Sequence, residues 1–138
     1  MAVSYPAPEE TVVNRVMLSA WRDRGALMIQ HCEDCSLAFY YPRNLCPRCW
    51  SSSLEWRASC GRGRIETFTV VHKPVDEVFA GEGNVVLAEV RVDEGVSLIT
   101  RIICDDPTTL AIGRRVGLLT GEGRDRYPLP VFVPQPAD

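Results

Sequence analysis

The sequence predicts a mainly β fold that consists of one N-terminal helix, a cysteine-rich segment and a small C-terminal barrel. An amphipathic pattern occupies the amino end, two Cys-x2-Cys pairs follow it, and strand-like patterns fill the second half of the chain. These changes in composition place boundaries at residues 1–25, 26–58 and 59–138. With 138 residues, 46% of them hydrophobic, the chain is long enough to bury a core without disulfide bonds.

The first expected element is an amphipathic helix from Glu9 to Arg24. Acidic residues open this segment, Arg22 and Arg24 close it, and Gly25 follows as a stop signal. Five apolar residues share one helical stripe: Val13, Val16, Met17, Ala20 and Trp21. Such a stripe usually packs on its own domain, although a terminal helix beside a small barrel can also dock a partner.

Four of the six cysteines form two close pairs. Cys32-x2-Cys35 is followed after ten residues by Cys46-x2-Cys49. Two such knuckles can place four thiolates around one zinc ion at about 2.3 Å, and iron could occupy the same sulfur cage. Four protein ligands leave no open coordination position, so we expect a structural metal. Four unrelated buried cysteines, or a thioredoxin-like redox motif without its strand and helix alternation, fit the spacing less well.

The other two cysteines and both histidines receive structural interpretations. Cys104 ends an apolar strand pattern and is expected in the core. Cys60 and His31 lie near the cysteine pairs, but we leave both out of the ligand set because four thiolates suffice. His72 has no nucleophile or paired carboxylate motif beside it, so we expect a structural residue and no general base.

Strand patterns begin after the cysteine-rich segment. Five segments have them: Arg64–His72, Asn84–Val92, Val96–Cys104, Arg115–Thr120 and Val131–Val133. Asp93-Glu94-Gly95 suits a hairpin turn, and Asp105-Asp106-Pro107 predicts a capped helical turn over residues 108–112. Five strands with one helical insertion fit a small, partly open barrel of the OB type, with a small sandwich as the alternative.

Charge is distributed unevenly along the chain. The formal net charge is -3, yet residues 36–65 contain five arginines and a single acidic residue, Glu55. The arginines are Arg43, Arg48, Arg57, Arg62 and Arg64. They could meet the phosphates of a nucleotide-containing ligand, a polynucleotide or an acidic protein surface, although a zinc site with four thiolates would lower the local excess of positive charge.

The sequence shows neither a membrane span nor a secretory leader. Its longest apolar runs fall far short of the roughly 20 residues that a bilayer span needs. Residues 1–10 contain two prolines and two glutamates and have no apolar stretch. We therefore expect a cytoplasmic protein without a membrane partner.

An ordered set of motifs resembles a known family across residues 13–134. The helix and the two knuckles come first, and then Phe39-Tyr40-Tyr41-Pro42-Arg43, Leu54-Glu55-Trp56, Gly61-Arg62-Gly63, residues 67–72, Asp93-Glu94-Gly95 and Leu129-Pro130-Val131-Phe132. In this order they resemble the acyl-CoA-associated OB-fold family with a rubredoxin-like zinc ribbon. Ser36 and Trp50 depart from that pattern, because the residue after a zinc knuckle is often glycine, and Cys60 stands where a small residue without a thiol is common.

The resemblance implies a non-catalytic accessory subunit in a hetero-oligomer, active in lipid or polyketide metabolism. Members of the family are partners of thiolase-fold enzymes such as acyltransferases, thiolases and steroid side-chain aldolases, or are fused to hydratase-like domains. It implies a CoA thioester or acyl-carrier substrate near the chain, with Arg43, Arg62 and Arg64 as candidates to meet the phosphates of CoA. The partner would cover apolar residues of the helix and of the segment Leu129–Pro134.

Two other classes of function remain as alternatives. OB barrels and zinc ribbons often bind polynucleotides, but the negative net charge and the single aromatic residue in the first three strand patterns, Phe68, argue against that class. A self-sufficient acyl-CoA enzyme would need an activated nucleophile or a paired acid and base, and the sequence shows neither.

Overall fold

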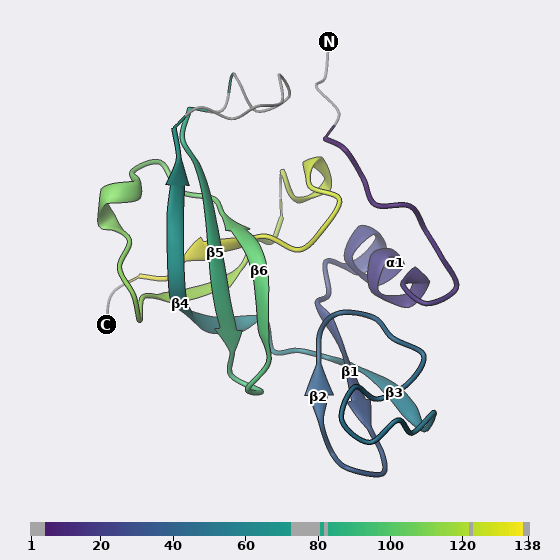
Figure 1. Cartoon of the computed structure of the whole chain (residues 1–138). Coiled ribbons are helices and arrows are strands. Elements are labelled where there is room, and N and C mark those ends of the chain that lie inside the picture. The colour runs from purple at the N-terminus through teal and green to yellow at the C-terminus, as the bar shows by residue number, and fades with distance from the viewer. Residues whose placement is uncertain (1–4, 73–80, 82, 122, 137–138) are drawn as a thin grey trace.

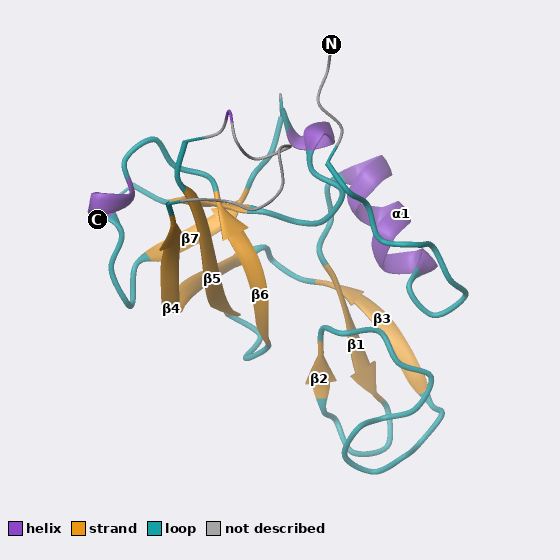
Figure 2. Cartoon of the chain, turned by 45° about the horizontal axis from the view of Figure 1, so that its top comes forward, coloured by secondary structure: helices purple, strands orange, loops and turns teal. Residues whose placement is uncertain are grey.

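The computed structural model describes residues 5–72, 81, 83–121 and 123–136. It is mainly β, with one α-helix, a small three-stranded sheet and a five-stranded barrel, as the sequence predicts. The barrel forms one lobe, while the small sheet and the helix lie together beside it (Figures 1 and 2). The described helices all fall short of the length and apolar character that a bilayer span requires.

The helix α1 (Arg15–Arg24) begins six residues later than the sequence pattern indicates. The reason is local, because Asn14 accepts a hydrogen bond from the Thr11 N–H at 2.7 Å and donates one to the Glu9 carbonyl at 3.0 Å. These bonds satisfy the backbone in a turn and compete with helix formation. Gly25 ends the helix as predicted, with φ of 64° and its N–H bonded to the Trp21 carbonyl.

The small sheet has the strand order β2-β1-β3 and is antiparallel throughout. Its strands are β1 (Met28–Cys32), β2 (Ala38–Phe39) and β3 (Leu54–Ala58). We call this sheet with its loops, residues 28–58, the ribbon. The sequence analysis missed β3 as a strand, since its side chains are half-buried or exposed and do not alternate, and its five residues are paired with β1 along their whole length.

The barrel has the strand order β4-β5-β6-β8-β7 and is closed, whereas the sequence suggested a partly open one. Its elements are β4 (Arg62–Val71), β5 (Val85–Val92), β6 (Ser97–Ile102), η2 (Pro107–Thr109), β7 (Arg115–Leu118), η3 (Arg124–Arg126) and β8 (Phe132–Pro134). The barrel is closed by a short parallel contact between β6 and β8, which share the residue pair Ile102 and Phe132. The expected turns form: Gly95 takes φ of 89° after β5, and Asp106 caps η2.

Two groups of buried apolar residues hold these parts together. The larger group fills the barrel and extends through Leu18, Leu27, Ile29 and Tyr40 to the helix and the ribbon. The smaller group joins Tyr5, Trp21, Tyr127 and Val131. The barrel, the ribbon and the helix therefore pack on one another directly.

Both ends of the described chain fold back on the barrel, which corrects an expectation from the sequence. Trp21 is 1% exposed, and its indole N–H donates a 2.7 Å hydrogen bond to the Tyr127 carbonyl. Val131 and Phe132 are also buried. The prediction that a partner protein covers the helix tryptophan and the C-terminal segment is wrong for Trp21, Val131 and Phe132, because the chain itself buries them.

Candidate metal centre and ligand surfaces

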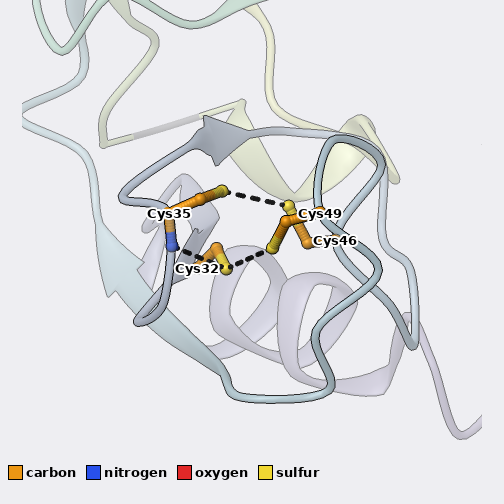
Figure 3. Close-up of side chains that lie close together, drawn as sticks. All are labelled: Cys32, Cys35, Cys46 and Cys49. Carbon is orange, nitrogen blue, oxygen red and sulfur yellow. Dashed lines mark hydrogen bonds between the residues drawn. The ribbon is translucent and has the colours of Figure 1, made fainter.

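The four paired cysteines come together at the end of β1 and in the ribbon loops, and Figure 3 shows their side chains close to one another. Their sulfur atoms all lie within 4.8 Å of one another. The Sγ atoms of Cys32 and Cys49 are 3.6 Å apart, and those of Cys35 and Cys46 are 3.5 Å apart. A tetrahedron with metal–sulfur bonds of about 2.3 Å has edges of about 3.8 Å, so the donor set fits one tetrahedral ion.

The two knuckles repeat one backbone design. In the first, the Cys32 N–H bonds to the Leu37 carbonyl and the Ser36 N–H to the Cys32 carbonyl, both at 2.9 Å. In the second, Cys46 bonds to the Ser51 carbonyl at 2.9 Å and Trp50 to the Cys46 carbonyl at 3.0 Å. Backbone N–H groups also point at sulfur, at 3.4 Å in each knuckle. The spacing of the cysteines in the sequence predicts the two knuckles, but it does not predict that both use the same backbone hydrogen bonds.

Ser36 and Trp50 occupy equivalent left-handed positions in the two knuckles, with φ of 65° and 66°. Glycine is common there because a side chain destabilises the left-handed backbone by about 1 kcal/mol. The departure from glycine that the sequence shows therefore leaves the turn geometry intact.

The balance of local hydrogen bonds and burial lowers the pKa of two of the four thiols and raises the pKa of the other two. Burial opposes ionisation of Cys46, but the N–H groups of Cys49 and Arg48 lower the pKa of Cys46 to about 6. The N–H of Ser51 favours ionisation of Cys49, but burial and the neighbouring thiols raise the pKa of Cys49 to about 12. The pKa of Cys32 is lowered chiefly by the backbone N–H of Cys35. Because negative charges at these distances repel one another, all four sulfurs can be thiolates at the same time only when a cation lies among them.

Polar side chains that the sequence analysis missed hold the ribbon loops in place. Gln30 is buried, accepts a hydrogen bond from the Arg43 N–H at 2.8 Å and donates one to the Arg43 carbonyl at 2.9 Å. Ser51 donates a hydrogen bond to the carboxylate of Asp34 and so links the two knuckles. A glutamine within an apolar run was the available signal, because a buried amide requires partners.

Cys60 and the two histidines lie outside the cluster of four sulfurs. His31 faces Glu55 across the β1–β3 pair, with Nδ1 3.6 Å from a carboxylate oxygen. Cys60 is exposed and lies near Glu94. His72 is exposed just beyond β4, and its Nδ1 lies 3.2 Å from the Asn84 side-chain oxygen.

Cys104 packs against the main core but is only partly buried. Burial, with the charges of Asp105 and Asp106, raises the pKa of its thiol. Cys104 is therefore a core residue, as predicted, and its thiol ionises less readily than that of an ordinary cysteine.

The three arginines predicted to meet a ligand are divided between two surfaces. Arg62 and Arg64 are exposed neighbours on β4, and Arg64 pairs in register with Arg91 of β5 and Arg115 of β7. Arg43 is exposed on the ribbon and lines a different hollow.

Two of the arginines on this barrel surface, Arg91 and Arg115, pair with nearby carboxylates. Arg115 donates hydrogen bonds of 2.9 and 3.2 Å to Asp93, and Arg91 lies 3.3 Å from Glu66. The hydrogen bond from Arg115, with the charges of Arg62 and Arg64, lowers the pKa of Asp93.

A large apolar groove lies where the ribbon meets the barrel. Its volume is about 650 Å³. Tyr41, Leu87, Ile99 and Leu129 line it and are partly exposed, and Arg101 is its charged lining residue. The Tyr41 hydroxyl accepts a 3.1 Å hydrogen bond from the Ile99 N–H, which fixes the ribbon to the edge of β6. None of Arg43, Arg62 and Arg64 lines this groove.

The fold and the cysteine site together define a protein with a zinc ribbon and an OB barrel. Family models agree: residues 22–55 match the ChsH2 rubredoxin-like zinc ribbon domain, and residues 56–120 match the ChsH2 C-terminal OB-fold domain. The chain belongs to this family, known as DUF35.

Two curated relatives have similar sequences. A DUF35 domain-containing scaffold protein of Methanothermobacter thermautotrophicus is 32% identical over 109 residues, which cover 76% of this chain and 81% of that protein. A probable enoyl-CoA hydratase alpha subunit of Thermomonospora curvata is 31% identical over 129 residues. That match covers 94% of this chain but only 40% of the relative.

Two solved structures share the fold. A chain of the Ltp2-ChsH2(DUF35) aldolase is 30% identical, with a TM-score of 0.78 over 92% of this chain and 98% of that one. A DUF35 protein of unknown function from Sulfolobus solfataricus is 12% identical, with a TM-score of 0.62 over 90% of this chain and 86% of that one.

Proposed function

We propose that the chain is a non-catalytic accessory subunit that binds a thiolase-fold enzyme and helps to form its acyl-CoA or acyl-substrate site. The observation that carries this proposal is the likeness, at 30% identity and over 92% of the chain, to a chain of the Ltp2-ChsH2(DUF35) aldolase. The name of the scaffold protein from Methanothermobacter supports an assembly role. The thiolase fold of the larger subunit follows from the family resemblance.

The environment of the reactive side chains supports a non-catalytic role. The His72 ring lies 3.2 Å from the side-chain oxygen of Asn84, which is a neutral amide and neither a carboxylate nor a nucleophile. Burial, with the charges of Asp105 and Asp106, raises the pKa of Cys104, which disfavours a thiolate nucleophile there. Chemistry would then be supplied by the larger subunit.

The metal in this proposal is zinc held by Cys32, Cys35, Cys46 and Cys49, with iron as the alternative. Four thiolates saturate the ion, so the bound metal supplies a cross-link between the two knuckles. The chain's own contribution is the set of backbone N–H groups that point at the sulfurs and stabilise their charge. Purified protein should contain about one metal ion per chain.

The 650 Å³ groove is our candidate for the acyl-facing surface. Its volume lies within the range of small-molecule sites, and its lining is mostly apolar with a few polar groups. The phosphates of CoA would be met elsewhere, by Arg62 and Arg64 on the barrel or by Arg43 on the ribbon. Because these arginines lie on two surfaces, alanine substitution of each separates the two routes by the CoA affinity of the assembled complex.

The decisive test is activity alone and in complex. The untagged chain is purified from its native host, the copurifying protein is identified, and acyl-CoA turnover is assayed for the chain alone and after the partner is added. We expect turnover only in the presence of a thiolase-fold subunit. Robust turnover by the lone chain, or no stable complex with any thiolase-fold protein, would overturn the proposal.

A second candidate is an accessory role in an acyl-CoA hydratase. The likeness to the hydratase alpha subunit of Thermomonospora curvata favours it, since that protein contains a region similar to nearly this whole chain. The same copurification distinguishes the two, because it identifies the partner as a thiolase-fold protein or as a hydratase.

A further inference from the structure

Trp50 combines a backbone position that favours glycine with a side chain that lies mostly outside the protein. Its φ is 66°, and 76% of the residue is exposed. A strained backbone persists where something compensates for it, and an exposed indole recovers little by packing within its own chain. The equivalent position in the first knuckle carries the small residue Ser36 with φ of 65°. The tryptophan is therefore unnecessary for the knuckle turn.

Trp50 borders a hollow of about 450 Å³ between the second knuckle and the start of the helix. Its lining includes Val13, Pro42, Arg43, Leu45, Pro47 and Trp50, and we call it the ribbon–helix groove. In Figures 1 and 2 the loop between β2 and β3 passes beside the start of α1 in both views.

The apolar surface extends beyond this groove. Leu45 in its wall is 42% exposed, and Val16, three residues beyond Val13, is 39% exposed. Val12, next to Val13, is 82% exposed. An apolar surface that contains an exposed tryptophan is typical of a protein interaction site.

Charge selects the kind of partner. Among the described residues that line the groove, Arg43 is the only charged one apart from the metal ligand Cys46, and Arg48 is exposed two residues before Trp50. The Arg43 backbone is held by Gln30, so its guanidinium projects from a fixed point. A second copy using the same surface would oppose arginine with arginine, which disfavours self-association. The surface instead fits a different protein with an apolar pocket bordered by carboxylates.

We propose that the ribbon–helix groove docks the larger enzyme subunit, with Trp50 inserted into an apolar pocket and Arg43 beside a carboxylate at its rim. This inference rests on the proposed function, because it assigns the docking surface of the same accessory subunit. Tryptophan and arginine are among the residue types that most often dominate the binding energy of protein interfaces. The surface adjoins the 650 Å³ groove at Pro42 but is otherwise lined by different residues, so that groove remains available to the substrate.

The test compares the two knuckles in the full-length chain. We would measure the Kd for the copurified larger subunit with the wild type, Trp50→Gly and its matched control Ser36→Gly, together with the thermal unfolding midpoint and the metal content. Both variants should retain metal and unfold at a higher temperature, since both relieve a left-handed backbone. Only Trp50→Gly should weaken the complex, by at least about tenfold.

Two further variants test the groove without changing the knuckle backbone. Leu45→Glu should weaken the complex while the unfolding midpoint stays within about 2 °C, because Leu45 is already 42% exposed and its glutamate replacement can reach solvent. Arg43→Glu should weaken the complex more than Arg43→Ala, and the Gln30 hydrogen bonds remain because they involve the Arg43 backbone. If Trp50→Gly fails to bind metal, Leu45→Glu and Arg43→Glu decide the question.

Several results would overturn the proposal. Wild-type affinity in Trp50→Gly and Leu45→Glu would remove the groove as the docking surface and leave the accessory function standing. Equal weakening by Ser36→Gly and Trp50→Gly would assign the effect to the knuckle backbone. Loss of oligonucleotide or CoA binding in Trp50→Gly, with unchanged affinity for the larger subunit, would assign the surface to that ligand. A wild-type chain that binds no larger subunit would remove both proposals together.

Discussion

The ribbon and the barrel are stable for different physical reasons. The barrel encloses a continuous apolar core, in which Ile65, Val90, Val116 and Phe132 are at most 1% exposed. The cysteine end of the ribbon has no comparable core in the described chain and is held by polar bonds and four clustered thiols. Removal of the metal should therefore disrupt one region, and removal of apolar volume should destabilise the other.

The largest expected effect is loss of the ribbon when its metal is removed. Cys46→Ser should reduce the metal content from about one ion per chain to near zero and abolish amide-exchange protection in β1 and β3, while β4 and β5 retain theirs. Structural zinc sites supply about 10–16 kcal/mol, far more than the remaining polar bonds. Cys60→Ser is the control and should keep the metal, because Cys60 lies outside the cluster. Metal near zero in wild-type protein prepared without chelator would contradict this prediction.

The corresponding change in the barrel is Phe132→Ala. Phe132 is 0% exposed and closes the barrel between β6 and β7, so its truncation should lower the free energy of unfolding by about 3–5 kcal/mol. Denaturant titration measures the loss, and the metal content should stay near one. Ile99→Ala, at a site 60% exposed, is the matched control and should change stability far less. Loss of metal in Phe132→Ala would show that the regions depend on each other more than this comparison states.

Gln30→Leu tests the polar bonds of the ribbon. The change leaves the N–H and the carbonyl of Arg43 without their partner and should lower the free energy of unfolding by about 1–3 kcal/mol. Gln30→Glu would bury a carboxylate against the Arg43 carbonyl at a position that is 4% exposed, so at neutral pH it should destabilise the fold at least as much as Gln30→Leu. Denaturant titration with metal bound separates the three proteins, and equal stability of all three would mean that the buried amide contributes nothing.

Turn residues give a smaller effect of opposite sign in the two regions. Ser36→Gly in the ribbon should raise the free energy of unfolding by up to about 1 kcal/mol, whereas Gly95→Ala in the barrel hairpin should lower it by about 1 kcal/mol. Both positions are left-handed, with φ of 65° and 89°, and open space surrounds the Cβ that alanine would place at Gly95. Thermal unfolding of both variants measures the signs, and a shared sign would contradict the argument.

The smallest expected effect is a dependence on pH that belongs to the barrel. The pKa of Asp93 is lowered by its hydrogen bond from Arg115, so this pair stabilises the fold above the unfolded pKa of about 4. The contribution is lost as the pH falls through the lowered folded pKa. Asp93→Asn should flatten the pH dependence of stability below about pH 4, and an unchanged slope would exclude the pair as its source.

The sequence was sufficient for the barrel strands and the cysteine pairs because both have short-range signals. Alternating apolar residues located β4 to β8 to within a few residues, and the spacing of Cys32, Cys35, Cys46 and Cys49 anticipated their convergence. The strand β3 has no such pattern, because it is defined by its pairing with β1.

Other features depend on contacts between residues far apart in the chain. The Gln30 bonds to Arg43 span 13 residues, and the contact of Trp21 with Tyr127 spans 106. Neither leaves a periodic trace in the sequence. For the same reason the sequence placed Arg43 with Arg62 and Arg64, whereas the fold separates them onto the ribbon and the barrel.

The hydrogen bond from Trp21 to the Tyr127 carbonyl also bears on the order in which the chain can mature during synthesis. The four paired cysteines and the three ribbon strands have been translated by residue 58, so the ribbon can capture its metal early. Tyr127 and Val131, which pack with Trp21, follow only after the strands β4 to β7. The helix α1 therefore precedes the ribbon in the sequence but is covered only after most of the barrel has been made, so its docking reports that both lobes are present.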